Sequence, residues 1–167
     1  MALLTHPRRA GEDRVVIDAV PIITAGAYGL GDALGGRLRF PRATHGAGHT
    51  AVIETLRLVD RAQQNFAIDL VLFDQPFTET ADNAVFAPSD RDMDHCIGVI
   101  NIPAAAYFNF STNAVAVLPL TDANWGMGVT VWTAESDALY GQMVVRGGAP
   151  TYVATDDLRL RLTLRRD

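Results

Sequence analysis

Three aspartates at alternate positions between Ser89 and His95 could begin a calcium-binding loop, because such a loop takes its first ligands from alternate residues. The loop also needs a glycine at its sixth position and a glutamate at its twelfth, and these are here His95 and Asn101. The pattern therefore fails at both diagnostic positions. A short helical turn capped by Ser89, with acidic side chains in its first turn, explains the same residues.

His45 and His49 lie four residues apart, but Gly46 and Gly48 between them argue against a helix on which they could share a metal ion. We expect a surface loop here. Cys96 leads into an apolar stretch, which predicts a buried, unreactive thiol. The serines lie in polar turns that lack the glycine-flanked elbow of a serine hydrolase. The sequence thus predicts no catalytic residue, no metal and no cofactor.

The stretch from Phe66 to Asp74 is the strongest candidate for a central strand. Both of its alternating faces are largely apolar, which is typical of a strand buried on two sides. Pro76 follows two residues after Asp74 and cannot continue a strand ladder. Residues 51–59 fit either a helical stripe or a strand. Their content of valine, isoleucine and threonine favours a strand, which the polar turn 60–65 would join to the central strand as a long hairpin.

Alternation predicts further short strands, separated by turns rich in glycine, proline, asparagine and aspartate. The stretch 15–23 contains Pro21, which favours an edge or a bend. The glycine-rich stretch 25–36 has no lysine and precedes a strand-like pattern, so turns explain it better than a phosphate-binding loop. The remaining strands are predicted at 97–102, 114–120, 129–133, 139–146 and 157–166.

The last of these strands has the clearest period. Leucines at 158, 160, 162 and 164 alternate with Arg159, Arg161, Thr163 and Arg165, which predicts one buried and one wet face. The whole pattern predicts an all-β fold: a single β-sandwich, jelly-roll-like, over residues 14–167. We expect its core to include Ile68, Leu70, Leu72, Val99, Val131, Val144, Leu160 and Leu162.

Residues 1–13 have no apolar pattern of their own and predict an extended N-terminal arm. A frayed end is one reading, and an arm that becomes ordered on a neighbouring subunit is the other. In the second reading the arm's charged residues bind a partner, together with the arginines of the last strand. These candidate partner-binding residues are Arg8, Arg9, Glu12, Asp13, Arg159, Arg161 and Arg165.

Composition excludes some partners. All fourteen basic residues are arginine, and nineteen acidic residues give a net charge of −5, so we expect no nucleic-acid partner. No apolar run reaches the roughly 18 residues that span a bilayer, and the N-terminus lacks the charge order of a secretory signal. We therefore expect that the protein does not associate with a membrane. We also expect that it is made in the cytoplasm.

An ordered set of motifs over residues 25–167 resembles a family of small virion structural proteins of tailed bacteriophages. The set comprises Ala-Tyr-Gly-x-Gly-Asp-Ala-x-Gly-Gly (27–36), Ile-Asp-Leu-Val-Leu-Phe-Asp (68–74), Thr-x-x-Ala-Asp-Asn-Ala (78–84), Ile-Gly-Val-Ile (97–100) and Leu-Tyr-Gly-x-Met-Val-Val-Arg-Gly-Gly-Ala-Pro-Thr-Tyr (139–152). The resemblance leaves the N-terminal arm outside.

The resemblance implies a non-enzymatic β-sandwich packed in many copies in the virion. The preferred role is a capsid decoration (cement) protein on the head surface. Its partners would be the major capsid protein and copies of itself in a cyclic homo-oligomer, for which a trimer is favoured. A neck or tail subunit remains an alternative. A carbohydrate- or ligand-binding module is another, with Tyr107, Trp125, Trp132 and Tyr140 as candidate platform residues.

Overall fold

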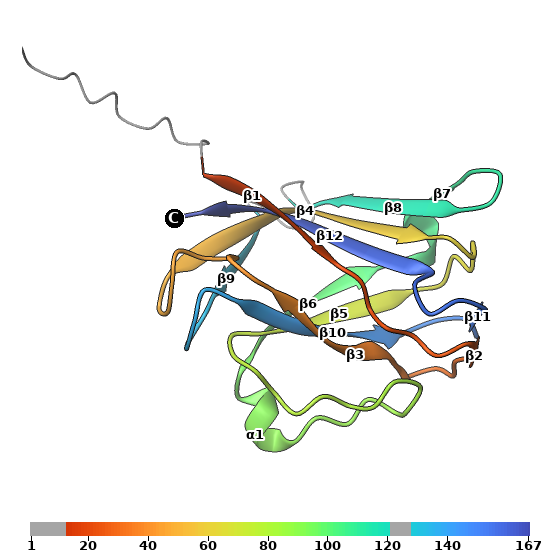
Figure 1. Ribbon diagram of the computed structural model, residues 1–167, viewed down its shortest axis with the longest axis horizontal. Coiled ribbons are helices and arrows are strands. Elements are labelled where there is room, and N and C mark those ends of the chain that lie inside the picture. The colour runs from red at the N-terminus through yellow and green to blue at the C-terminus, as the bar shows by residue number, and fades with distance from the viewer. Residues whose placement is uncertain (1–12, 121–127) are drawn as a thin grey trace, which may run out of the picture.

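The computed structural model describes residues 13–120 and 128–167, and almost every regular element in it is a β-strand (Figure 1). A four-residue helix, α1 (Asp90–Met93), and a short 3₁₀ turn, η1 (Ala104–Ala106), are the helical elements of the described residues. The strands are β1 (Arg14–Ala19), β2 (Gly26–Ala27), β3 (Ala33–Phe40), β4 (Thr50–Asp60), β5 (Ile68–Phe73), β6 (Cys96–Ile102), β7 (Tyr107–Asn109), β8 (Ala114–Pro119), β9 (Val129–Trp132), β10 (Leu139–Val145), β11 (Thr151–Tyr152) and β12 (Leu158–Arg166).

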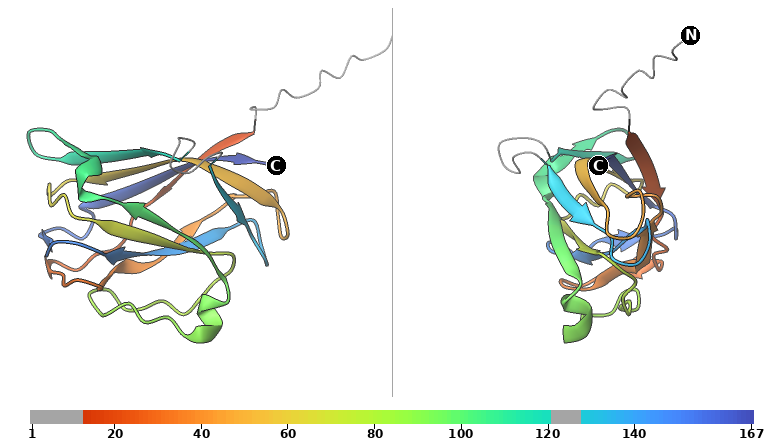
Figure 2. Two further views of the ribbon diagram at one scale, coloured as in Figure 1. Left: turned by 180° about the vertical axis from the view of Figure 1, so that it is seen from behind. Right: turned by 90° about the vertical axis from the view of Figure 1, so that its left-hand side faces the viewer.

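The strands form two stacked antiparallel sheets, as Figure 2 shows from two further sides. The six-stranded sheet has the order β1-β12-β4-β8-β7, and β9 pairs with the other end of β4. The four-stranded sheet has the order β3-β10-β5-β6, and β2 and β11 form a separate small ladder. The all-β, sandwich-like fold predicted from the sequence is confirmed.

The eight strands of six or more residues pair in a nested order. The first pairs with the last (β1 with β12), the second with the seventh (β3 with β10), the third with the sixth (β4 with β8), and the two middle strands with each other (β5 with β6). Pairing of β12 with β4 and of β10 with β5 then joins these ladders side by side into the two sheets. The chain is thus one long antiparallel ribbon wound over on itself.

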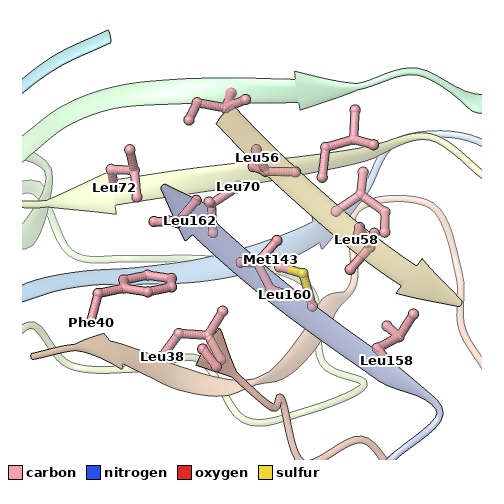
Figure 3. Packing of buried hydrophobic residues seen from close by; sticks show 14 of the residues in the cluster. Leu38, Phe40, Leu56, Leu58, Leu70, Leu72, Met143, Leu158, Leu160 and Leu162 are labelled. Carbon is pink, nitrogen blue, oxygen red and sulfur yellow. The ribbon is translucent and has the colours of Figure 1, made fainter. Parts of the chain in front are cut away.

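The main core lies between the sheets and is built by two-residue alternation. All four leucines of β12 that alternate with arginine are buried in it, as the sequence predicted. Figure 3 shows how side chains of the two sheets interdigitate, with Leu56, Leu58, Leu158, Leu160 and Leu162 from one and Leu38, Phe40, Leu70, Leu72 and Met143 from the other. Seven of the eight expected core residues are buried, namely Ile68, Leu70, Leu72, Val131, Val144, Leu160 and Leu162.

The eighth expected core residue, Val99, was predicted wrongly and is 43% exposed. Its strand, β6, is an edge of the four-stranded sheet. Ile100 and Ile102 take the inward positions of β6, so Val99 points outward. Cys96, at the start of the same strand, is only half-buried, which corrects the prediction of a buried thiol. Alternation in the sequence shows which residues of a strand share a face, but it does not show whether that strand lies at the edge of its sheet.

The segment between β4 and β5 also differs from the prediction. The two strands belong to different sheets, so the expected hairpin is wrong and the chain crosses from one layer to the other. Buried Asp60 organises the crossing, because its carboxylate accepts hydrogen bonds from the backbone N–H groups of Ala62, Gln64 and Asn65 at 2.7–3.2 Å. Burial of this carboxyl raises its pKa. Gln63 and Asn65 adopt left-handed backbone conformations that turn the chain.

The outer side of the four-stranded sheet is also covered, over β5 and β10 but not over Val99 of β6. Residues 74–89, the covering segment, run beneath it together with α1 (Figure 1). Phe77 of this segment stacks on Phe73 of β5 with ring centroids 3.9 Å apart, in a second buried cluster that includes Val71, Tyr140 and Val144. This second layer explains why both faces of the central strand read as apolar.

Hydrogen bonds fix the covering segment to the sheet. The buried amide of Gln142 in β10 donates to the carbonyl oxygens of Gly35 (2.9 Å) and Thr80 (2.6 Å) and accepts from the Thr80 N–H (3.1 Å). The Asp82 carboxylate accepts from the Tyr28 hydroxyl and from the Gly35 N–H. Ser89 caps α1, with its hydroxyl accepting from the Asp92 N–H at 3.1 Å, so the predicted helical turn is confirmed.

Candidate functional site: the outer face of the six-stranded sheet

The outer face of the six-stranded sheet, which points away from the four-stranded sheet, has no cover among the described residues. Cross-strand register defines it, since directly opposed residues of antiparallel strands point to the same side. Asp18, Arg161, Arg57 and Val117 form one row across β1, β12, β4 and β8. The neighbouring rows add the side chains of Val16, Val59, Phe108, Val115, Arg159 and Thr163.

Arginines dominate the charge of this outer face. It carries five of them (Arg14, Arg57, Arg159, Arg161 and Arg165) against two acidic residues (Asp18 and Glu54), a net charge of +3 on a chain of −5. Arg14 and Arg165 share Glu54, at 2.8 and 3.6 Å. Arg161 forms a two-pronged pair with Asp18 at 2.6 and 2.8 Å, and this hydrogen bonding lowers the pKa of the Asp18 carboxyl.

Apolar side chains interrupt the charges on the outer face. Val16 is 55% exposed, Phe108 68% and Val117 45%. Phe110, directly after β7, is also exposed, and the hairpin that carries it is braced by Gln63, whose side chain donates to the carbonyl oxygen of Asn113 at 2.9 Å. Exposed aromatic side chains and arginines are enriched at protein–protein interfaces.

The structure places the predicted partner-binding residues in different settings. Arg159, Arg161 and Arg165 lie together on the outer face, as the alternation of the last strand predicted. Asp13 does not belong to a free arm, because its carboxylate accepts from Arg166 at 2.5 Å and contacts His45. Its hydrogen bond to Arg166 lowers the pKa of Asp13, and its carbonyl also accepts from the Arg166 N–H. Arg8, Arg9 and Glu12 lie outside the described residues.

Sequence reasoning missed Arg57, Asp18 and Phe108 as parts of this face. Arg57 could have been found, because it alternates with Leu56 and Leu58 once the ambiguous stretch is taken as a strand. Asp18 joins the face only through the pairing of the first strand with the last, which no local pattern shows. The stretch around Phe108 was not predicted as a strand, and β7 is only three residues long.

The histidines form no metal site in the part of the chain that the structure describes. The rings of His45 and His49 meet edge to face with centroids 6.2 Å apart, and His45 contacts Asp13. His95 Nδ1 lies 3.2 Å from the Asp74 carboxylate, which also accepts from the Trp132 indole N–H at 3.1 Å. Within residues 13–120 and 128–167 no three potential ligands gather.

The aromatic residues considered for a sugar platform do not form one in residues 13–120 and 128–167. Tyr140 is buried in the second cluster, and Tyr107 packs partly buried against the main core. Trp132 is 45% exposed but donates its N–H to Asp74. Trp125 lies outside the described residues. Among the described residues, Phe108 (68%) and Phe110 (60%) are more exposed than any of these candidates.

Comparison of the sequence with protein-family models gives no match, and comparison with curated proteins gives none either. Among the described residues, no helix has both the length and the apolar content needed to span a membrane.

Proposed function

We propose that this protein is a non-enzymatic structural protein of a tailed bacteriophage virion, a capsid decoration protein that bridges neighbouring capsid subunits on the head. The outer face of the six-stranded sheet is its docking surface, and the major capsid protein is the partner. The observation that carries the proposal is the asymmetry of the sandwich. The covering segment covers the outer side of the four-stranded sheet over β5 and β10, whereas the outer face of the six-stranded sheet exposes valines, a phenylalanine and arginines.

The nested strand pairing supports this proposal at the level of the fold. An antiparallel ribbon of eight strands, wound so that the first pairs with the last and the middle two with each other, fits the jelly-roll arrangement that we propose for this sandwich. Jelly rolls recur in viral structural proteins, although a fold by itself does not determine function. The resemblance of the motifs in residues 25–167 to virion proteins points in the same direction.

The charge of the outer face favours a protein partner with an acidic surface. The face is basic on a chain that is acidic as a whole, so it attracts acidic patches and orients the subunit. Copies of the chain would assemble as a cyclic oligomer, with a trimer favoured, so that several such faces bind at once. Multivalent attachment turns modest individual affinities into stable binding.

Attachment to particles tests the proposal. Replacing both Phe108 and Val117 by serine should weaken binding of the purified protein to virions that lack it by about tenfold or more, because these side chains form the apolar part of the face. The matched control is Val99→Ser, an equally exposed valine on the other sheet, which should bind like the unchanged protein. Unchanged attachment of the double variant, measured by co-sedimentation, would rule out this face.

The arm is expected to contribute a separate part of the attachment. Deleting residues 1–12 keeps Asp13 and its bonds to Arg166, so the sandwich should remain folded, with its unfolding temperature within about 2 °C of the full chain. Attachment to particles should weaken, because an arm that becomes ordered on a neighbour adds contact surface. If the truncated protein binds particles as tightly as the full chain, Arg8, Arg9 and Glu12 make no contact that matters.

Two alternatives to the decoration role lead to different observations. A carbohydrate- or ligand-binding module would bind glycans in a way that depends on Trp132, which is the exposed one of the four candidate platform residues within the described part of the chain. A neck or tail subunit would be found in purified tails and not on heads.

A further inference from the structure

Arg57, Arg159 and Arg161 surround a shallow hollow of about 140 Å³ on the outer face, which we call the arginine pocket. Its other lining residues are Asp18, Val20 and Val59. Arg57 comes from β4, both other arginines from β12, and Asp18 from β1, so three adjacent strands of one sheet hold the charged groups in place.

The charges of the arginine pocket do not balance. Arg161 lies directly opposite Arg57 on one side and Asp18 on the other. Like charges opposite each other on neighbouring strands are destabilising. Asp18 is engaged by both prongs of Arg161, and within the described residues Arg57 and Arg159 have no ion-pair partner of their own. Three positive charges thus meet one negative charge.

We infer that the arginine pocket binds a carboxylate of the partner protein, an aspartate or glutamate side chain that enters between Arg57 and Arg159. Guanidinium groups pair with carboxylates through two parallel hydrogen bonds, and both arginines have exposed side chains for this purpose. Val20 and Val59 flank the pocket and would contact the methylene groups of the incoming side chain. This inference rests on the proposed function and names the partner's chemistry at one point of the docking surface.

A nucleic-acid phosphate fits the arginine pocket less well than a protein carboxylate. Nucleic acids bind along rows of basic residues, and here the next arginines on the face, Arg14 and Arg165, are already paired with Glu54.

Peptide binding tests the pocket directly. In low salt, an acetylated hexaglutamate peptide titrated into the full chain should shift the NMR signals of Val20 and Val59, and hexaglutamine should not. Combining Arg57→Gln with Arg159→Gln should weaken hexaglutamate binding by about tenfold or more. Arg91→Gln, an exposed arginine on α1, is the control and should change nothing. Absent binding, or tighter binding of a thymidine hexanucleotide at these residues, would overturn the inference.

Thermal stability gives an independent reading. If the two arginines are kept for binding, the double glutamine variant should unfold about 1–3 °C higher than the unchanged protein, because repulsion within the pocket is relieved. A lower unfolding temperature would mean that the arginines support the fold, and the inference would be wrong.

Attachment to particles separates this inference from the proposed function. Loss of attachment in the Phe108 and Val117 double variant, with normal attachment in the arginine variant, would remove the arginine pocket but keep the function. If the unchanged protein binds hexaglutamate but does not attach to particles, the arginine pocket is kept and the proposed function is wrong.

Discussion

Replacing Leu70 by alanine should lower the free energy of unfolding by about 2–5 kcal/mol. Leu70 is completely buried at the centre of the four-stranded sheet, between β10 and β6, and points into the main core. Removing its branched end leaves a cavity that the surrounding strands cannot close, because they are fixed by pairing on both sides. Urea unfolding followed by circular dichroism measures the change.

Val99→Ala is the matched control for Leu70→Ala. Val99 lies on the neighbouring strand, where its paired residue is Val71, but it is 43% exposed. Its truncation should cost less than about 0.5 kcal/mol, as is usual for surface positions. Equal costs for the two variants would contradict the layer arrangement described above, and a cost for Leu70→Ala well below 2 kcal/mol would place that side chain outside the core.

Replacing Gln142 by leucine should lower the free energy of unfolding by about 2–4 kcal/mol. The two side chains are similar in size, so the change isolates hydrogen bonding from packing. The variant loses three hydrogen bonds, and the carbonyl oxygen of Gly35 and both backbone groups of Thr80 lose their partner. A polar group left unpaired in a buried position costs more than the hydrogen bond itself contributes.

The position of these bonds predicts where the damage appears. Thr80 belongs to the covering segment, so hydrogen exchange of residues 74–89 should speed up in Gln142→Leu more than exchange in β4 or β12. Gln142→Glu keeps the acceptor for the Thr80 N–H and loses both donors, so its cost at low pH, where the carboxyl can donate again, should be smaller than at pH 7. Uniform loosening across both sheets would show that Gln142 does not anchor the segment.

Two-residue alternation accounts for most of what the sequence predicted correctly. It placed β6, β8, β9, β10, β12 and the second half of β3, together with the inward leucines of β12, because a strand buried on one face repeats its chemistry every second residue. The first half of β3 lies in the glycine-rich stretch 25–36, which was predicted as turns. It also separated Arg159, Arg161 and Arg165 from the core and so identified part of the outer face. Capping chemistry likewise predicted the turn at Ser89.

Features that depend on strand partners were not predictable in the same way. Val99 is apolar and alternates correctly, yet its exposure depends on β6 being an edge. The turn after Asp60 is polar, and both hairpins and crossings between sheets have polar turns. Its sequence therefore does not show which of the two connections forms. The arginine pocket needs β1, β4 and β12 side by side, and these strands are far apart in the chain.

The nested pairing of strands also dictates when this protein can fold. Phe73 pairs with Cys96 in the innermost ladder, whereas Arg14 pairs with Arg165, about 150 residues further along the chain. Contacts of such long separation form slowly, because a large loop has to close first. β12 lies between β1 and β4, so on the ribosome the six-stranded sheet lacks an inner strand until residues 158–166 have emerged. Leu56 and Leu58 lack their partners Leu162 and Leu160 until then, and apolar surface that is exposed for a time during synthesis favours aggregation.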